Sequence, residues 1–106
     1  MPKFLLEASY VGEGVKGLLK EGGSSRRAAA TKFVQSLGGS VEAFYYAFGA
    51  ADAYIIIDVP DNVTAASLAL TINASGLVTV KTTALMSVEE VDLAVKKSPT
   101  YRPPGQ

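Results

Sequence analysis

The chain has 106 residues, ten acidic and ten basic side chains, and a formal net charge of zero. This length gives one domain with one hydrophobic core, and the neutral charge argues against a nucleic-acid binder, which needs a basic surface. Cysteine and histidine are both absent, so disulfides, thiolate or histidine-ligated metal sites and histidine-based catalysis are excluded.

Apolar runs in the chain are only a few residues long, which is too short to span a bilayer. The amino terminus also lacks the charged-then-apolar pattern of a secretory signal. We therefore expect a cytoplasmic protein that binds neither membrane nor nucleic acid and uses no cofactor.

Residues 4–10 alternate apolar side chains with a mixed set, which is the period of a strand. Residues 11–21 then carry apolar side chains at helical spacing, although glycines within the segment each weaken a helix by up to about 1 kcal/mol. A firmer helix is expected over residues 26–37, with Ser24 or Ser25 as its N-cap. The chain thus opens with a strand followed by a broken helical segment.

Residues 41–58 predict two strands joined by a turn near residues 49–52. Simple alternation places apolar side chains on both faces of this hairpin: Val41, Ala43, Tyr45 and Ala47 on one, and Phe44, Tyr46 and Phe48 on the other. The helices of so short a chain cover only one face of a small sheet. The other face is therefore expected to pack on a second subunit or to close over a ligand.

The second half of the chain repeats the order of helix and strand. Asp61 is placed to cap a helix that ends before Gly76, and residues 77–85 predict another strand. Ser87 and the glutamate three residues later have the spacing of a capping box, which opens a last helix.

The order β-α-β-β-α-β with a terminal helix predicts an α+β, ferredoxin-like antiparallel sheet with helices on one face. The apolar residues on both faces of the hairpin further predict a dimeric α+β barrel, in which two sheets pack across a two-fold axis. We divide the chain into one domain over residues 1–98 and a proline-rich C-terminal arm over residues 99–106. Tyr101 is expected to pack this arm on its own or a neighbouring subunit.

Three segments carry a resemblance to a known family: EGGSSRRAA at 21–29, GAADAYIIID at 49–58, and YRPPG at 101–105. With these segments the chain resembles the GYD domain family, small bacterial proteins of uncharacterised function, over nearly its whole length. The family name refers to a Gly, a Tyr and an Asp within the second segment. The resemblance implies the same ferredoxin-like, dimeric α+β barrel and brings no established reaction or cofactor.

Four side chains are candidates for binding a small anionic molecule. Arg26 and Arg27 follow a glycine-rich turn at the start of a helix, where guanidinium groups and free amides hold carboxylate or phosphate. Lys81 and Tyr54 lie on predicted strands, where they would be among the few polar contacts of an apolar barrel interior. In the alternative interpretation, the arginines pair with nearby glutamates and Lys81 lies on the rim.

Three groups are candidates for the base of a cofactor-independent proton-transfer enzyme of the tautomerase or isomerase type. Glu7 or Asp58 would serve if burial raised its pKa. Pro2 would serve if removal of Met1 freed its secondary amine. In the alternative interpretation, Asp58 caps the end of a strand and Pro2 reflects amino-terminal processing.

The sequence leads to three interpretations in order of preference. The first is a homo-oligomer, at least a dimer, that binds a small anionic organic molecule. The second is the proton-transfer enzyme, and the third is a purely structural assembly protein. The expected partners are further copies of the chain and the small ligand.

Overall fold

The computed structural model describes residues 1–106 and contains four strands and four helices. In chain order they are β1 (Lys3–Tyr10), α1 (Glu13–Glu21), α2 (Gly23–Ser36), β2 (Ser40–Tyr46), β3 (Ala53–Asp58), α3 (Asn62–Ala74), β4 (Val78–Leu85) and α4 (Val88–Lys96). None of these helices combines the length and the hydropathy that crossing a bilayer requires.

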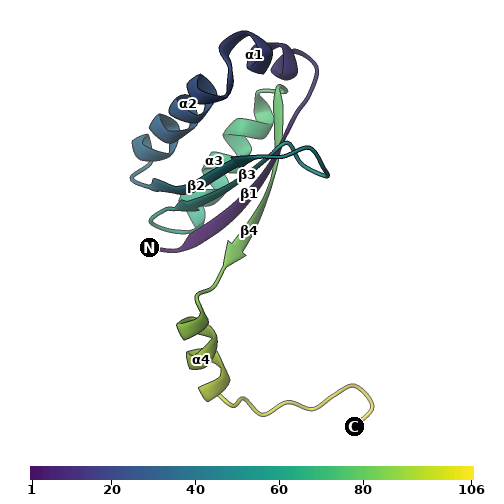
Figure 1. Ribbon diagram of the computed structural model, residues 1–106. Helices are drawn as coiled ribbons and strands as arrows, with labels where there is room; N and C mark the ends of the chain where they lie inside the picture. The colour runs from purple at the N-terminus through teal and green to yellow at the C-terminus, as the bar shows by residue number, and fades with distance from the viewer.

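The four strands form one sheet in the order β2-β3-β1-β4, and every neighbouring pair is antiparallel. The helices α1, α2 and α3 lie on one side of the sheet and leave its other side open (Figure 1). We call this uncovered side the open face. The arrangement confirms the predicted α+β class with a ferredoxin-like sheet, while the pairing of two such sheets stays a prediction.

The buried core lies between the sheet and the helices α2 and α3. Its main side chains come from both layers: Phe4, Leu6, Ile55, Ile57 and Val80 from the strands, and Val34, Ala65 and Leu68 from the helices. Burying one aliphatic side chain of this size contributes about 1.5–3 kcal/mol. The core contains no buried polar or charged side chain, so apolar packing is the main interaction between the two layers.

A β-bulge in β2 changes which hairpin residues share a face. The register with β3 shifts between Val41 and Ala43, so Glu42 is an extra residue in the ladder. As a result Val41 packs against the core beside Phe44. The alternation predicted from the sequence was therefore wrong for Val41, because a period of two cannot reveal an inserted residue.

The start of α2 also differs from the prediction. The helix begins at Gly23 with Gly22 as its N-cap residue, so neither Ser24 nor Ser25 caps it. Gly22 has a φ of 82°, which glycine adopts without the strain that a Cβ would cause. This residue allows α1 and α2 to follow one another directly.

The two other predicted caps are confirmed. Asp61 Oδ1 accepts a hydrogen bond from the Thr64 backbone N–H at 2.8 Å, and this bond lowers the pKa of Asp61. Ser87 Oγ accepts from the Glu90 backbone N–H at 3.1 Å, and Glu90 Oε1 accepts from the Ser87 N–H at 2.9 Å. Short-range spacing was enough to predict both helix starts.

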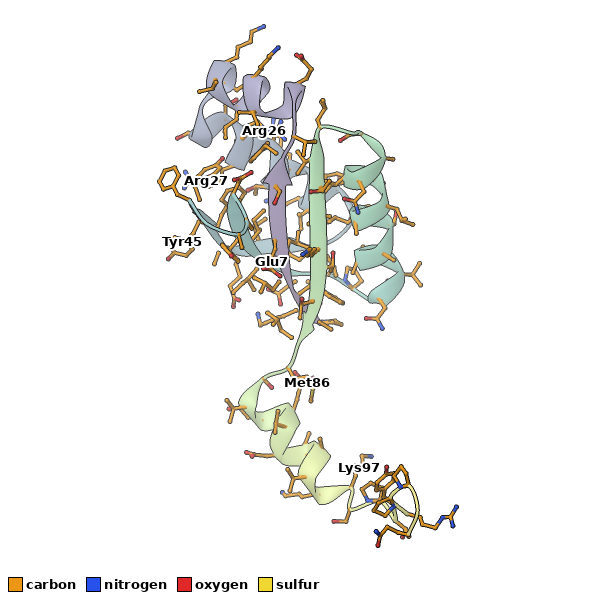
Figure 2. All side chains as sticks on the ribbon, turned by 90° about the vertical axis from the view of Figure 1, so that its right-hand side faces the viewer. Glu7, Arg26, Arg27, Tyr45, Met86 and Lys97 are labelled. Atoms are coloured by element: carbon orange, nitrogen blue, oxygen red, sulfur yellow. The ribbon has the colours of Figure 1, made fainter.

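The C-terminal part of the chain extends away from the sheet (Figures 1 and 2). The radius of gyration is 17.0 Å, whereas a compact chain of this length has a value of about 13 Å. The helix α4 buries none of its residues, and Tyr101 is 73% exposed. The expected packing of Tyr101 on its own subunit is therefore absent from the single chain.

Gly14 is buried where α1 contacts Leu77, the residue before β4, and this contact gives a test of the fold. A Cβ at Gly14 would overlap the carbonyl group of Leu77. We expect Gly14→Ala to lower the free energy of unfolding by about 1–3 kcal/mol, the usual range for overpacking. Urea unfolding followed by circular dichroism measures this loss.

Gly17→Ala is the matched control, because a Cβ at Gly17 on the same helix would meet nothing within 4 Å. It should be neutral or stabilise the protein by up to about 1 kcal/mol, since alanine is the better helix former. Equal stability of the two variants would contradict the close contact between α1 and β4.

Candidate functional site

Three cavities on the helix side of the sheet share one side chain, that of Tyr10 at the end of β1. The hairpin cavity, with a volume of about 380 Å³, lies between α1 and the β2–β3 loop. The interhelix cavity, of about 310 Å³, lies between α2 and α3. The α1 cavity, of about 360 Å³, is lined largely by residues of α1. We call the three together the Tyr10 cleft. Their volumes are in the range that small-molecule sites occupy.

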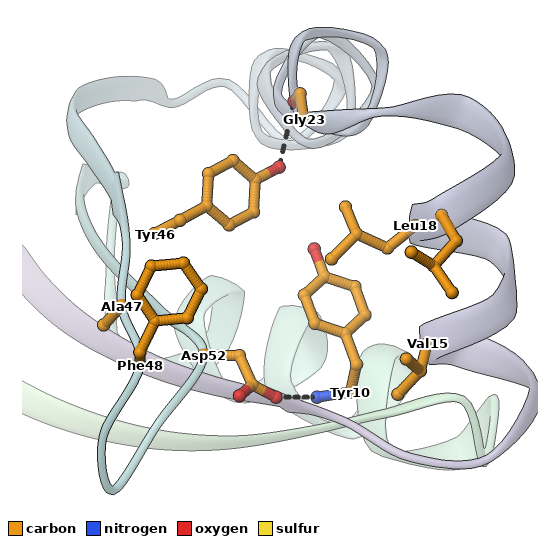
Figure 3. A pocket seen from close by; sticks show the side chains of 9 residues that line it. Tyr10, Val15, Leu18, Gly23, Tyr46, Ala47, Phe48 and Asp52 are labelled. Atoms are coloured by element: carbon orange, nitrogen blue, oxygen red, sulfur yellow. Dashed lines mark hydrogen bonds between the residues drawn. The ribbon is translucent and has the colours of Figure 1, made fainter.

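The hairpin cavity is mostly apolar and is open to solvent (Figure 3). Its lining residues come from β1, α1, the start of α2, and the hairpin: Tyr10, Val15, Leu18, Leu19, Gly23, Tyr46, Ala47, Phe48 and Asp52. The side chains of Leu19 and Phe48 are both highly exposed. Exposed apolar side chains around a cavity are typical of a surface that receives an apolar partner or ligand.

Two phenols and one carboxylate are the polar groups of the hairpin cavity. The Tyr46 hydroxyl donates to the Gly23 carbonyl oxygen at 2.9 Å, and Asp52 Oδ2 accepts from the Tyr10 backbone N–H at 2.8 Å (Figure 3). The Tyr10 hydroxyl points into the same space. The cavity can therefore offer hydrogen bonds to a polar group on a mainly apolar ligand.

Burial raises the pKa of the Tyr46 phenol above its ordinary value of 10.0, and the neighbouring Tyr10 raises it further. The positive charges of Arg26 and Arg27 act in the opposite direction without cancelling the effect. Both arginines thus lie close enough to act on a group inside the cavity. At neutral pH Tyr46 keeps its proton and donates it in a hydrogen bond.

The interhelix cavity has the sheet as its floor and α2 and α3 as its walls. It has 12 lining residues: Leu6, Ala8, Tyr10, Arg26, Ala29, Ala30, Phe33, Phe44, Ile55, Ile72, Val78 and Val80. The alanines of α2 are too small to fill the space between the two helices. Arg26 is the one charged residue of this lining, so a single cation lies beside an apolar space.

Arg26 is only loosely paired within the protein. Its Nη1 lies 3.5 Å from Glu21 Oε2, the longest of the four ion pairs in the chain, and its side chain is 34% exposed. This confirms that the arginine pairs with a nearby glutamate. A guanidinium group has five N–H donors, so this one contact leaves donors free for an anionic group.

The structure separates the residues that the sequence suggested for binding. Arg26 lines the Tyr10 cleft, whereas Arg27 lines a neighbouring surface pocket with Ser24. Figure 2 shows both arginines near the two N-terminal helices, with Glu7 farther along β1. Lys81 lies on the open face, on the side of the sheet opposite the cleft. Of these residues, Arg26 alone contributes to the Tyr10 cleft.

Glu7, Tyr54 and Lys81 form one row across the open face, because Glu7 is the cross-strand neighbour of both other residues. Asp58 Oδ1 lies on the same face and accepts from Lys3 Nζ at 2.9 Å. Asp58 is thus a partner of Lys3, whose pKa this contact raises, and not a strand cap. No three carboxylates come together as a metal site would require.

Pro2 lies at the opposite end of β1 from Tyr10, and its carbonyl oxygen accepts from the Val59 backbone N–H at 3.1 Å. Sequence reasoning did not select Tyr10, Tyr46 or Asp52 as site residues. The position of Tyr10 was visible in part, because it continues the alternation of Leu6 and Ala8 on the helix side of β1. Tyr46 and Asp52 come close to Tyr10 only through the folding of the β2–β3 hairpin, and no pattern of neighbouring residues in the sequence indicates this contact.

The family model of the GYD domain matches residues 4–95 of the 106-residue chain. This span contains the sheet except for Lys3, the first residue of β1, and all but the last residue of α4. Neither the curated proteins nor the solved structures gave a match to the chain. The match therefore identifies the family of the chain and does not identify a reaction or a ligand.

We expect one phenol of the protein to ionise above pH 10, and we expect Tyr46→Phe to remove that late phase. A raised pKa means that folding favours the neutral phenol. The contribution of Tyr46 to stability is therefore complete below its unfolded pKa and is lost as the pH rises through its folded pKa. Phenolate absorbance during a pH titration measures the late phase.

Tyr101→Phe is the matched control, because Tyr101 lies in the exposed C-terminal segment. This variant should retain the late phase, and a late phase that persists in Tyr46→Phe would show that another phenol carries the raised pKa.

Proposed function

The chain belongs to the GYD domain family, and we propose that it binds a small organic molecule with an apolar body and one anionic group in the Tyr10 cleft. The observation that carries this proposal is the interhelix cavity, where one cation, Arg26, lies among apolar lining residues. Apolar cavities with a few convergent polar groups are the usual form of small-molecule sites. The same composition favours a ligand of mixed character over a free inorganic anion.

The apolar body of the ligand would lie on the strand floor formed by Leu6, Ala8 and Ile55. Each Å² of apolar surface removed from water there contributes about 25 cal/mol. The anionic group would accept hydrogen bonds from the Arg26 guanidinium, which matches a carboxylate in a two-pronged geometry. Tyr10 lines the same cavity as Arg26, and its hydroxyl points into the adjoining hairpin cavity.

The geometry supports binding better than the proton-transfer alternative. Glu7, Asp58 and Pro2 lie outside the Tyr10 cleft. Asp52 is the carboxylate of the hairpin cavity, but its hydrogen bonds hold the hairpin: the backbone N–H donates to the Ala8 carbonyl oxygen at 2.8 Å, and Oδ2 accepts from Tyr10. A carboxylate fixed by such bonds is suited to ordering the cavity.

We also propose that the protein is a homodimer whose subunits pack through the open face. An apolar row crosses this face in register, made of Ala43, Ile56 and Leu5 on three neighbouring strands. Acidic and basic side chains lie on both sides of the row, so two copies can approach without strong net repulsion. A cytoplasmic location stays a prediction from the sequence.

Calorimetric titration with naphthoate tests the binding proposal, with naphthylmethanol as its neutral analogue. We expect naphthoate to bind at least about tenfold more tightly than the alcohol, because a hydrogen bond to a charged group contributes about 1.5–3 kcal/mol. Equal affinity of the acid and the alcohol, or no binding of either, would contradict an anion-selective site.

Arg26→Gln should weaken naphthoate binding by about tenfold or more and leave the alcohol unchanged. Arg27→Gln is the matched control, because Arg27 is the next residue and lines a different pocket. It should bind naphthoate like the unmodified protein. Equal losses in the two variants would point to a general effect of positive charge.

A further inference from the structure

The C-terminal residues 86–106, which we call the α4 segment, contain an amphipathic helix without a partner in its own chain. Val88, Val91 and Val95 recur at the spacing of one helix face, and they are 75%, 46% and 72% exposed. Leu93 lies two residues from Val91, on nearly the opposite side of the helix. The valines form a stripe that the isolated chain leaves in contact with water.

The helix α4 is well formed although it is short. Its capping box closes the first turn, Glu89 and Glu90 lie near the N-terminus, and Lys96 lies in the last turn, as the helix dipole favours. Isolated helices shorter than about 12–15 residues are nevertheless marginal in water. A nine-residue helix therefore needs tertiary packing, and its own body does not provide it.

The direction of the chain indicates where that packing comes from. Figures 1 and 2 show β4 running directly into α4 beyond the end of the sheet, with the rest of the segment extending farther out. The last residue of β4, Leu85, is the cross-strand neighbour of Lys3 on the open face. The α4 segment thus begins at the edge of the surface through which the two subunits of the proposed homodimer would meet.

A second copy of this chain fits the segment in size as well as in position. Residues 86–106 would be added to the open face on each subunit, and stable interfaces use about 20–30 residues a side. The segment also carries large apolar side chains that such an interface would cover: Met86, Val88, Val91, Val95 and Tyr101. The matched family region extends to residue 95 and so includes the valine stripe.

We propose that the two subunits of the homodimer exchange their α4 segments, so that Val88, Val91 and Val95 of each copy pack on residues 1–85 of the other. The exchange rests on the homodimer of the proposed function and is independent of the ligand. It covers the apolar stripe, and it explains why the chain is extended well beyond the radius of a compact monomer.

Paramagnetic broadening in mixed dimers tests the exchange directly. The chain contains no cysteine, so Lys97→Cys accepts one spin label at the end of α4. Spin-labelled chains without nitrogen-15 are refolded together with nitrogen-15 chains that carry no label. We expect broadening of amide signals from residues 1–85 of the nitrogen-15 chain. Sharp signals throughout that chain would overturn the proposal.

Val91→Asp and its matched control Leu93→Asp provide a second test by light scattering. Both substitutions place a carboxylate on the same exposed helix, outside the buried core, so the fold of residues 1–85 should persist, which circular dichroism checks. Val91→Asp should raise the dimer dissociation constant by at least about tenfold, because it buries a charge in the contact. Leu93→Asp should have a much smaller effect, and equal effects would overturn the proposal.

The outcomes also separate this inference from the proposed function. A monomer in the unmodified protein at micromolar concentration would overturn both the homodimer and the exchange. A dimer that Val91→Asp leaves intact, with no broadening between subunits, would overturn the exchange alone. Naphthoate binding is measured separately and depends on neither result.

Discussion

The constraint on which the rest of this structure depends is that the helices cover only one face of a four-stranded sheet. The buried side chains of the core between the sheet and α2 and α3 are all apolar, and their packing is the main interaction between the layers. The open face combines an apolar row with charged side chains. The two faces therefore differ in chemistry, and our proposals assign ligand binding to one and assembly to the other.

The Tyr10 cleft follows from how the helices lie on their side of the sheet. Small side chains such as Ala29 and Ala30 leave space between α2 and α3, and side chains along an empty space lose part of their packing attraction. A ligand that filled the space would restore contacts, and it would stabilise the native state by an amount that rises with the logarithm of its concentration above Kd. In the proposed complex, Arg26 would set the orientation of the ligand by binding its charged end.

Local sequence signals were enough to predict most of the secondary structure and the fold class of this protein. The alternating and helical periods placed the strands and helices, short-range spacing placed the caps at Asp61 and Ser87, and the element order gave the ferredoxin-like class. The glycine-rich turn drew attention to Arg26, which lines the Tyr10 cleft, while its role in binding stays a prediction. These features could be predicted because each depends on residues within a few positions of one another.

Only the tertiary structure decided the rest. It placed Lys81, Tyr54, Glu7 and Asp58 on the face opposite Arg26, and the extra residue Glu42 reversed the expected side of Val41. It also joined Tyr10 to Tyr46 and Asp52, residues that lie more than thirty positions apart in the sequence. A periodic pattern shows which residues share a face of one element. Which elements meet, and which face is covered, depends on packing between distant segments.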